Sequence, residues 1–400
     1  MQVLDGIKVL DVTQFISGSR CTQILADMGA EVVRVEPPSG ETFRLIVNLV
    51  PGAERDYSVL NRNKYGITLD WRKPEGLDIM CRLVSLSDIF IHNLIPGTLE
   101  RYHLGYEGLK KVKEDIIYVS ISGFGSTGVN PERAAFDIIA QATSGQFWYD
   151  TDDLKPPTNH WADMISGAYA AIAVLFALIH RMKTGQGQFI DISMQDVLYF
   201  NNYRAIMDKG MWPIMDQVEK TLGRELDNVL NSEDRMPFYG FFKSSDGKVA
   251  IVALTQRQWG DLAQIIGHPE MADDPRFSNV IAQIHNHEEA VRRIEKWTSV
   301  HTSKEIVEIL EAKKIPCGIA YTIEEVIEDE NLKQRGMFQK VRHKRYGDVD
   351  VPGIPYKFSE ISGSINTPGP DLGEHNHYIL NKWLGYSEEE VNKLHEKGVI

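Results

Sequence analysis

Cysteine is scarce in this chain, and its scarcity excludes two kinds of architecture. Cys21, Cys81 and Cys317 are the only cysteines among 400 residues, and they lie far apart. An odd number at such distances gives neither a disulfide framework nor the paired spacing of a zinc site, so we expect no bound metal. Proteins poor in disulfides are typical of reducing compartments, which favours a cytoplasmic location. The first eight residues also lack the basic and apolar segments of a signal peptide.

Positive charge is also in short supply. The chain has 43 Lys and Arg residues against 56 Asp and Glu residues, for a net charge of −13. Proteins that bind nucleic acids need a basic face, so we expect no nucleic-acid partner. A local basic pocket for a small anion is still compatible with this balance.

Long apolar runs are missing as well. Residues 164–179 form the most apolar stretch. That stretch is shorter than the roughly 20 residues that a membrane-spanning helix needs. We therefore expect a buried core helix at this position and no membrane association.

The motifs of several enzyme classes are absent. The segment between Thr13 and Cys21, which follows the first apolar run, contains only Gly18. The glycine fingerprint that lets a pyrophosphate approach the backbone is therefore missing. Glu36 ends the second apolar run, where an acidic residue could meet a ribose, but without the glycines an NAD site is disfavoured. HExxH, GxSxG and P-loop motifs do not occur.

The first half of the chain alternates between short apolar runs and helical periodicity. The apolar runs predict strands at 7–12, 31–36, 67–69, 88–92 and 116–120. Pro74 predicts the start of one intervening helix, because proline favours the first helical position. A long helical pattern runs from Asp163 to Met182, and Gly185 ends it before a further strand at 189–193. Strands separated by helices indicate βαβ units, so we expect an α/β fold with a mostly parallel, Rossmann-like sheet.

A second, smaller unit follows a charged connection at about residues 200–235. Residues 239–243 and 249–254 resemble strands and flank Ser-Ser-Asp-Gly, a strong hairpin signal. Helical patterns follow at 258–266, 287–298 and 303–312. A hairpin followed by helices predicts a smaller α+β domain. A length of 400 residues agrees with two domains.

The segment around Asp163 is the most informative for chemistry. Asp163 precedes an apolar helix, and aspartate is among the best N-cap residues, so a purely structural role is the first interpretation. The same position also has a chemical consequence. Backbone N–H groups and the helix dipole should keep the carboxylate ionised. An ionised carboxylate in a partly desolvated pocket is a usable nucleophile.

Motifs along nearly the whole chain resemble those of the family III CoA-transferases, the group that contains formyl-CoA:oxalate and carnitine CoA-transferases. The matching segments, in chain order, are LDGIKVLD (4–11), LADMGAEV (25–32), NRNK (61–64), LDWRKPEG (69–76), NLIPG (93–97), SGFG (122–125), FDIIAQA (136–142), HWADMISG (160–167), KTGQGQ (183–188), IPCG (315–318) and PGPDLGEH (368–375). Each segment is weak alone, but their order over the full length is specific.

The resemblance implies an architecture and a reaction. The large, Rossmann-like CoA-binding domain would be residues 1–200 completed by 326–400, with a linker at 201–224 and a small α+β domain at 225–325. Two chains would form an interlocked homodimer. The enzyme would transfer CoA from an acyl-CoA to a carboxylic acid through an aspartyl anhydride and an aspartyl-CoA thioester. Acyl-CoA and CoA would be substrates, and no permanently bound cofactor or metal would be needed.

The resemblance also implies site residues. Asp163 would be the catalytic carboxylate. The CoA contacts would be Gln14, Phe15, Ile16, Ser17, Leu69, Arg72, Asn93, Leu94, Arg101, Ala134, Phe136 and Asp137. Arg72 and Arg101 suit phosphate, because guanidinium groups form paired bonds to phosphate oxygens, although exposed arginines also serve solubility. Asp137 could equally be a structural hydrogen-bond acceptor.

Two departures from the family pattern affect the reaction. Some members have a run of glycines in the linker over the active site, where this chain has residues 226–235 instead. The related α-methylacyl-CoA racemases need a histidine at the position of Phe136, and phenylalanine cannot transfer a proton. Racemisation of an acyl-CoA is therefore the disfavoured alternative. A catalytically silent acyl-CoA-binding protein and a dinucleotide-dependent oxidoreductase are the remaining ones, opposed by the context of Asp163 and by the missing glycines respectively.

Overall fold

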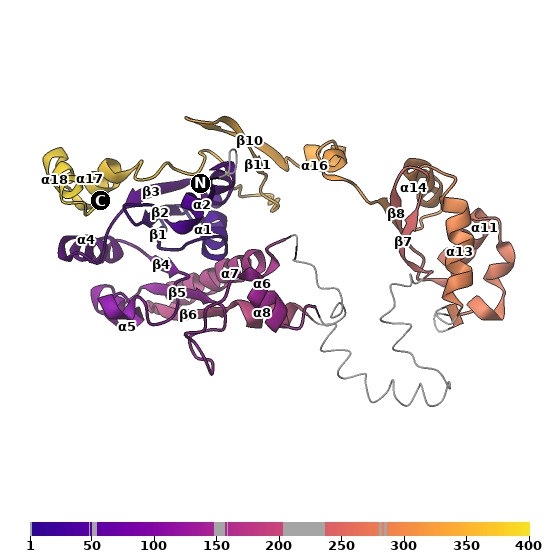
Figure 1. Cartoon of the computed structure of the whole chain (residues 1–400), viewed down its shortest axis with the longest axis horizontal. Coiled ribbons are helices and arrows are strands. Elements are labelled where there is room, and N and C mark those ends of the chain that lie inside the picture. Colours follow the sequence, from indigo (N-terminus) through magenta and orange to yellow (C-terminus); the bar gives the residue numbers. More distant parts are fainter. Residues whose placement is uncertain are drawn as a thin grey trace. The chain divides into compact units, whose positions relative to one another are not determined.

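The computed structural model describes residues 2–47, 49, 54–147, 157, 159–202, 237–279, 282–283 and 286–400. The chain divides into two units, the first made of Met1–Ile206 with Asn331–Ile400 and the second of Met207–Glu330 (Figure 1). Residues 203–236 lie outside the described part, and they include most of the expected linker at 201–224, the start of the expected small domain and the segment 226–235. The boundaries given above therefore stay predictions.

The first unit is built on a parallel sheet of six strands. The strands are β1 (Lys8–Asp11), β2 (Glu31–Glu36), β3 (Lys64–Thr68), β4 (Ile89–His92), β5 (Ile117–Ser122) and β6 (Gln188–Ser193). Their order is β3-β2-β1-β4-β5-β6, and all five neighbouring pairs are parallel. This is the 3-2-1-4-5-6 order of doubly wound nucleotide-binding folds, so the expected α/β sheet is confirmed.

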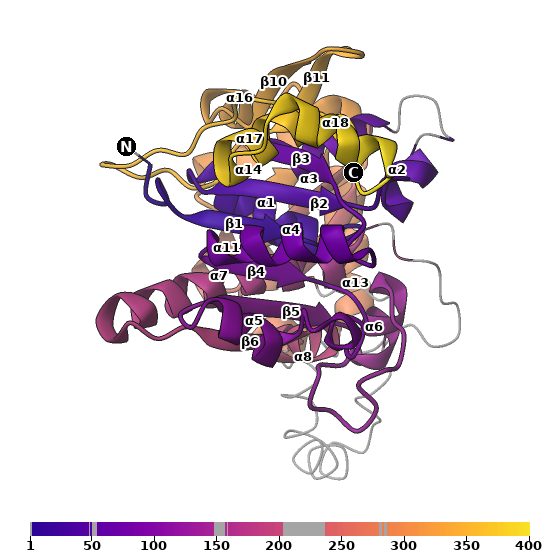
Figure 2. The ribbon, with the colours of Figure 1, turned by 90° about the vertical axis from the view of Figure 1, so that its left-hand side faces the viewer.

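Helices cover both faces of this sheet, as Figure 2 shows. Successive strand residues point to opposite faces, so Val9 packs on one side and Leu10 on the other. The Leu10 face is covered by α4 (Pro74–Ser85), α5 (Tyr106–Val112), α17 (Asn376–Leu384) and α18 (Glu388–Glu396). The Val9 face is covered by α1 (Ser17–Asp27), α7 (Trp161–Thr184) and α8 (Met194–Asn201). Both faces are therefore buried, which explains the continuous apolar runs of the strands.

One strand begins earlier than its sequence suggests. We expected a strand at 67–69, but β3 starts at Lys64, which is buried. From the sequence alone, a lysine at this position indicates an exposed loop, because buried lysines are rare unless they are paired. Here its ammonium group has buried partners from other elements, which local sequence does not show.

Helix α7 is longer than the apolar stretch that predicted it. It has 24 residues, from Trp161 to Thr184, and Gly185 follows as the left-handed C-cap with φ of 74°. By length and composition alone, it is the one helix in the described part of the chain that could cross a membrane. Its buried face is made of small residues such as Gly167 and Ala170, and a side chain at Gly167 would collide with the Ser17 carbonyl. This close approach packs α7 directly against α1.

Shorter elements complete the first unit. They are α2 (Thr42–Val47), α3 (Glu54–Asn61), η1 (Glu100–Tyr102), α6 (Asp137–Thr143), α16 (Glu330–Gln334) and the antiparallel hairpin β10 (Phe338–His343) and β11 (Gly347–Pro352). The C-terminal segment is tied to the edge strand β3: Asn376 accepts from the Thr68 N–H at 2.8 Å, and its amide donates to the Thr68 hydroxyl. The final helices thereby complete the core of the N-terminal sheet.

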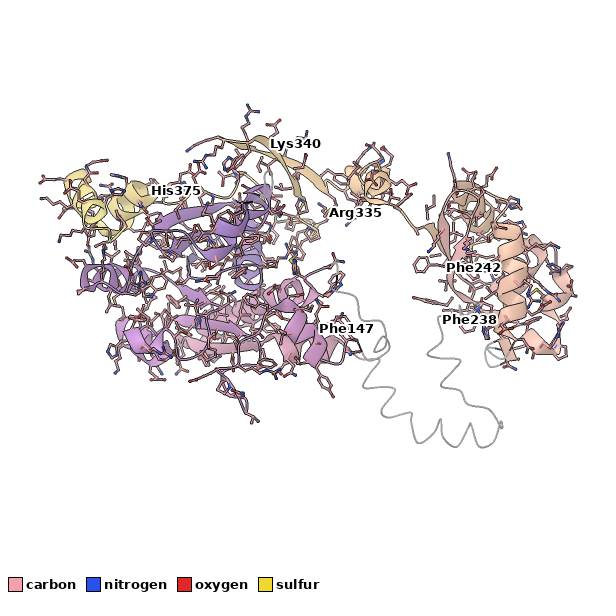
Figure 3. All side chains as sticks on the ribbon, in the orientation of Figure 1. Phe147, Phe238, Phe242, Arg335, Lys340 and His375 are labelled. Atoms are coloured by element: carbon pink, nitrogen blue, oxygen red, sulfur yellow. The ribbon has the colours of Figure 1, made fainter. Side chains whose placement is uncertain are left out.

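The second unit has a sheet of its own. Strands β7 (Tyr239–Lys243), β8 (Lys248–Val252) and β9 (Cys317–Ile319) are antiparallel, and the expected hairpin joins the first two. The helical elements of this unit are α11 (Gln256–Ile265), η2 (Pro269–Ala272), η3 (Pro275–Phe277), α13 (His287–Thr298), α14 (Ser303–Ala312) and α15 (Ile323–Val326). Phe242 of β7 is fully buried in their common core. Phe238, just before β7, is also buried, and Figure 3 labels both residues.

Candidate active site

The crevice of the first unit opens between β1 and β4, where the strand order reverses. In open α/β sheets, ligands bind at this switch point, beyond the carboxyl ends of the strands. The turn after β1 and the turn after β4 meet here. The Asn93 side chain accepts from the Gln14 N–H at 2.7 Å and donates to the Gln14 carbonyl at 2.7 Å and to the Ser17 hydroxyl at 3.1 Å. One side chain thus fixes the turn that leads into α1.

Beside Asn93, a buried histidine fixes the start of the second turn. His92 ends β4, and burial lowers its pKa to about 3, so the imidazole stays neutral. A neutral ring nitrogen can accept a hydrogen bond, and Nδ1 accepts from the Leu94 N–H at 3.3 Å. Both turns of the crevice are therefore held by side chains at the strand ends.

Phe15 has a left-handed backbone with φ of 54°, which is uncommon for a bulky residue. Its N–H points to the Glu41 carboxylate at 3.4 Å, and the same carboxylate accepts from the Phe43 N–H at 2.9 Å. Arg34 holds Glu41 in turn through an ion pair of 3.1 Å that is buried on both sides. The surroundings therefore hold Phe15 in this conformation, with its ring edge-on to Phe136 at a centroid distance of 5.3 Å.

Arg34 belongs to a buried charge cluster beneath the crevice. It lies 3.4 Å from Asp11, which also lies 3.2 Å from the Lys64 ammonium group. Burial alone would raise the pKa of Asp11, but Lys64 and Arg34 hold it well below its usual range. Burial lowers the pKa of Lys64 to about 8, against the attraction of Asp11. The cluster also binds Thr13, which donates its N–H and hydroxyl to Asp11, so these charges anchor the start of the turn.

Asp163 lies in the first turn of α7, but it is not the N-cap that the sequence suggested. The N-cap is His160, and Asp163 is the third residue of the helix. The Asp163 N–H donates to the Asp137 carboxylate at 3.1 Å. Burial, and then the charge of Asp137, raise the pKa of Asp163 to about 7, while hydrogen bonds from Ser17 lower it in part. The helix N-terminus was expected to keep this carboxylate ionised, but burial and the charge of Asp137 outweigh it and raise the pKa.

Asp137, His160 and Asp163 form a compact group. Their ligand atoms all lie within 4.8 Å of one another, and the His160 ring nitrogen is 3.8 Å from Asp137. Such a set of atoms could hold a metal ion by geometry. His160 is 63 % exposed, and sequence analysis assigned it no role. Its position directly before the helix of Asp163 was the only signal that could have found it.

A cavity of about 630 Å³ joins these groups. The expected site residues that line it are Gln14, Phe15, Ile16, Ser17, Asn93, Leu94, Ala134, Phe136, Asp137 and Asp163. The structure also adds lining residues that sequence analysis missed, among them Ile95, Thr98, Ile121, Ser122 and Met194. Their positions in the sequence could have indicated them, because each lies at or just beyond the carboxyl end of a strand. The turns after β1, β4 and β5 and the start of α7 thus converge on one cavity.

Three expected contact residues do not line this cavity. Leu69 is only 1 % exposed and packs in the core next to α4, so its side chain has no free surface for a ligand. Arg72 is exposed and forms a two-point ion pair with Asp70, at 2.7 and 3.1 Å. Arg101 is exposed and lies in η1, after β4. The two arginines remain candidates for a ligand group that extends beyond the cavity.

Glu36 is not available for a ribose. It is 1 % exposed, and the Arg44 guanidinium holds it at 2.6 and 2.9 Å. The Tyr57 hydroxyl donates to the same carboxylate at 2.8 Å. A dinucleotide site would therefore lack an available acidic residue for the ribose as well as the glycines for the pyrophosphate.

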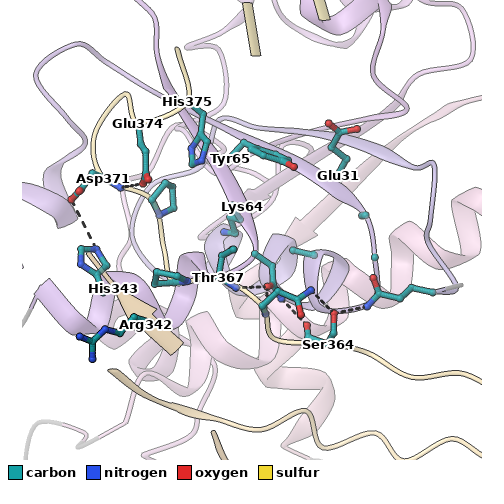
Figure 4. A pocket seen from close by; sticks show the side chains of 18 of the residues that line it. Glu31, Lys64, Tyr65, Arg342, His343, Ser364, Thr367, Asp371, Glu374 and His375 are labelled. Carbon is teal, nitrogen blue, oxygen red and sulfur yellow. Dashed lines mark hydrogen bonds and ion pairs between the residues drawn. The ribbon is translucent and has the colours of Figure 1, made fainter. Parts of the chain in front are cut away.

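A second cavity of similar size, about 660 Å³, lies at the amino ends of β2 and β3 (Figure 4). Glu31 and Lys64 line it from the strands, and Arg342, Asp371 and His375 from the C-terminal segment. Its exposed charges are mostly paired within the chain. Lys382 holds Glu31 at 2.9 Å, Arg342 holds Asp348 at 2.9 Å, and Lys344 pairs with Glu374. The cavity lies at the edge of the sheet opposite to the switch point.

Comparisons with known proteins agree with this geometry. The family model described as CoA-transferase family III matches residues 4–376. A succinyl-CoA–D-citramalate CoA-transferase of Chloroflexus aurantiacus is 32 % identical over 99 % of this chain and 98 % of its own length. A formyl-CoA:oxalate CoA-transferase of Streptomyces coelicolor is 31 % identical over 100 % and 99 %.

The fold has solved counterparts too. A CAIB/BAIF family protein from Brucella suis has a TM-score of 0.78 and 29 % sequence identity, over 96 % of this chain and 99 % of that one. The relatives and the solved structure thus match at least 96 % of the chain. This chain belongs to CoA-transferase family III and is a CoA-transferase.

Proposed function

We propose that the enzyme transfers CoA from an acyl-CoA to a carboxylic acid, with Asp163 as the nucleophile. The observation that supports this most is the position of Asp163. Its carboxyl group lines the cavity at the switch point of the sheet, beside Ser17 and Asp137, and its pKa of about 7 leaves the ionised form well populated at neutral pH. A carboxylate with a raised pKa is a stronger nucleophile than an ordinary aspartate. No Lys or Arg is among the described residues that line the cavity with it.

The reaction then runs in two symmetric halves. The Asp163 carboxylate attacks the thioester carbonyl, and CoA leaves as a thiolate, which gives a mixed anhydride. The thiolate attacks the aspartyl carbonyl, so the donor acid leaves as a carboxylate and an aspartyl-CoA thioester remains. The acceptor carboxylate attacks this thioester, and the released thiolate attacks the acceptor carbonyl of the new anhydride. Asp163 is regenerated, and no ATP, oxidant or metal enters the balance.

The turn at Ser17 has a second task in this scheme. Ser17 lies beside the Asp163 carboxyl group, and its hydroxyl and backbone N–H lower the pKa of that group in part. Each acyl substitution places negative charge on a carbonyl oxygen, and fixed donors near that oxygen stabilise the transition state. Because Asn93 holds Ser17, and Glu41 and Arg34 hold the neighbouring Phe15, these donors are in place before substrate binds.

For CoA itself, we propose that the pantetheine arm lies along Gln14–Ser17, Asn93 and Leu94, with the thioester near Ala134, Phe136 and Asp137. The nucleotide end would extend from the cavity toward Arg72 and Arg101. Arg72 would have to exchange Asp70 for a phosphate. That exchange is feasible because the pair is exposed to solvent, which screens the attraction between its charges.

Racemisation of the acyl-CoA at its α-carbon is the alternative. A proton would have to be removed on one side and returned on the other. Phe136 has no proton to exchange, and it occupies the wall beside Asp137. Incubation with an acyl-CoA in deuterated water separates the two reactions. Transfer moves CoA to a second acid without label, whereas deuterium at the α-carbon without transfer would contradict the proposal.

The direct test is to trap the intermediate. The enzyme is incubated with an acyl-CoA, treated with hydroxylamine or borohydride, and digested for mass spectrometry of the modified peptide. The expected adduct is on Asp163, and Asp163→Asn, which keeps the shape without the carboxylate, is the matched control. Trapping at Asp137 in place of Asp163 would overturn the assignment of the nucleophile. If no carboxylate is trapped and Asp163→Asn retains transfer, the covalent mechanism is wrong.

We also propose that the enzyme is a homodimer. Helix α7 has an outer face of exposed apolar side chains at helical spacing, which includes Ile172, Phe176, Ile179 and Met182. Phe176 is 67 % exposed and Met182 85 % exposed, and a contiguous apolar stripe of this kind is typical of an interface. Light scattering should give twice the 45.3 kDa mass of one chain at every native concentration. A mass of one chain would contradict the dimer.

A further inference from the structure

The chemistry of the cavity wall around Asp163 indicates which acids the enzyme takes. Apolar side chains form most of this wall, among them Phe15, Ile16, Ile95, Phe136, Ile138 and Met194. They come from the turns after β1, β4 and β5 and from the start of α8. Because they belong to four separate parts of the chain, the apolar surface is a property of the folded site and not of one local segment.

The aromatic part of this wall is exposed to the cavity and is supported by neighbouring rings. Phe136 is 62 % exposed, although it is a large apolar side chain in the middle of a binding crevice. Its ring rests on Phe15 at 5.3 Å, and Phe15 rests on Phe43 at 6.2 Å. Glu41 holds the backbone of both Phe15 and Phe43. A preformed aromatic surface that faces a cavity gains stability when an apolar group of a ligand covers it.

The charges of the wall have one sign. Among the described residues that line the cavity, Asp137 and Asp163 are carboxylates, and none is Lys or Arg. His160 is the one side chain there that can become a cation, and its nearest carboxylate is Asp137 at 3.8 Å. The amide of Asn93 is already bonded to the turn of Gln14. The donors that remain in the wall, such as the Ser122 hydroxyl, which has no hydrogen-bond partner, are uncharged. A second substrate carboxylate would therefore meet no Lys or Arg among the described lining residues.

A second carboxylate on the substrate would be unfavourable in this cavity. It would lose its hydration against apolar walls, and an ionised group that is buried without a partner is costly. It would also lie near the charges of Asp137 and, in the free enzyme, of Asp163. The carboxylate that reacts avoids this cost, because it becomes a neutral thioester.

We infer that the acyl groups carried by this enzyme come from monocarboxylic acids with an apolar remainder, either aryl or branched aliphatic. The inference rests on the proposed function and specifies its substrate class. It differs from the relatives named above, because the acids that their names pair with succinyl-CoA and formyl-CoA, citramalate and oxalate, are dicarboxylic acids without a large apolar group. Phe136 is the specificity-determining residue, since its ring is the exposed apolar surface beside Asp137.

The test compares different acids by the rate of their identity exchange, a reaction in which an acyl-CoA is incubated with its own isotopically labelled acid. Each such reaction has an equilibrium constant of one, so differences in kcat/KM report the site alone. Glutarate and 5-methylhexanoate form a matched pair, because an isopropyl group replaces the second carboxylate at the same chain length. Exchange should be at least tenfold faster in kcat/KM for 5-methylhexanoate and for 3-phenylpropionate than for glutarate. Equal rates, or faster exchange of glutarate, would overturn the inference.

Variants of Phe136 provide the second measurement. Phe136→Arg should shift the ratio of kcat/KM values toward glutarate by at least tenfold, mainly through KM, because it supplies the missing cation. Phe136→Leu is the control, and it should keep the preference for the apolar acids. If both variants change the ratio alike, or if neither does, Phe136 does not set the specificity.

The trapped adduct keeps this inference separate from the proposed function. If Asp163 is labelled by glutaryl-CoA with a higher kcat/KM than by the apolar acyl-CoAs, the substrate class is wrong and the aspartyl mechanism stands. If no acyl-CoA of either class labels Asp163, the mechanism itself fails. Labelling by the apolar acyl-CoAs in preference to glutaryl-CoA supports both.

Discussion

The first unit has two cavities of nearly equal volume, and they differ in almost every other respect. The cavity at the carboxyl ends of the strands holds about 630 Å³ and contains two neighbouring carboxylates in apolar walls. The cavity at the amino ends holds about 660 Å³ and is lined by charges that pair with each other. Volume therefore does not identify a reactive site. What distinguishes the first cavity is a pair of carboxylates with no Lys or Arg among the lining residues that the structure describes.

The contrast has a physical origin in the sheet. At the switch point, the turns after β1 and β4 diverge to opposite faces, so a crevice opens that ligands can fill. The protein stabilises this crevice from below, with the buried pairs of Arg34 and Lys64 to Asp11, and leaves Asp163 and Asp137 facing each other above. At the amino ends, the C-terminal segment covers the strands, and its charges satisfy those of the sheet.

The largest effect on CoA transfer is expected from the loss of the Asp163 carboxylate, the group that distinguishes the first cavity from the second. Asp163→Ala should lower kcat for CoA transfer on the order of 10³-fold or more, as loss of a covalent nucleophile does. Asp163→Glu should fail as well, because one added methylene displaces the attacking oxygen from its near-attack position. The fold should survive, since Asp163 is not the N-cap of α7. Near-native transfer by Asp163→Ala, with an unchanged circular dichroism spectrum, would disprove its role.

The nucleotide end of the CoA site is the next part to test. Arg72→Ala combined with Arg101→Ala should weaken CoA binding by about 1.5–3 kcal/mol for each charged hydrogen bond lost. Calorimetry with CoA measures this directly. The matched control is Arg292→Ala with Arg342→Ala, two exposed arginines of which the second lines the amino-end cavity. Equal affinities of the two double variants would remove Arg72 and Arg101 from the site.

Local signals were enough for most of the fold. The strand at 31–36, the helix start at Pro74 and the helix end at Gly185 were predicted at the residues where the structure has them. These positions depend on apolar runs, on the fixed φ of proline and on the left-handed conformation that glycine allows. The strand order could not be read, because it depends on contacts between distant segments.

The candidate site was predictable in its members but not in its electrostatics. The resemblance placed Gln14, Asn93 and Asp163 together, and they line one cavity. The raised pKa of Asp163 depends on burial and on Asp137, which is 26 residues away in the sequence. The left-handed Phe15 is likewise imposed by Glu41, so neither feature has a local signal.

The raised pKa of Asp163 makes a prediction about pH. Only the ionised carboxylate attacks, so kcat/KM should fall about tenfold for each pH unit below about 7, where the pKa of Asp163 lies. The pKa is above its usual 3.8, so the folded state binds the proton more tightly than the unfolded chain. Asp163 therefore contributes less stability as pH rises from about 4 through about 7.

The stability of a variant checks the same pKa without catalysis. Asp163→Asn keeps the size of the side chain and cannot ionise. Relative to the wild-type enzyme, its Tm should rise at pH 8 by a few °C, roughly what 1 kcal/mol produces, and by less at pH 5. A pH–rate profile with no acid limb above pH 5, together with no gain in Tm at pH 8, would show that Asp163 titrates as an ordinary aspartate.

The smallest effect is expected in the amino-end cavity. Lys382→Ala breaks the ion pair with Glu31, whose carboxylate still accepts from the Trp383 indole at 3.1 Å. Lys382 is 47 % exposed, and such pairs contribute about 0–1 kcal/mol, so stability should change little. The KM for acyl-CoA should stay within twofold, because the cavity faces away from the switch point. A tenfold rise in KM would mean that the paired charges of this cavity serve a ligand after all, and the contrast between the two edges of the sheet would fail.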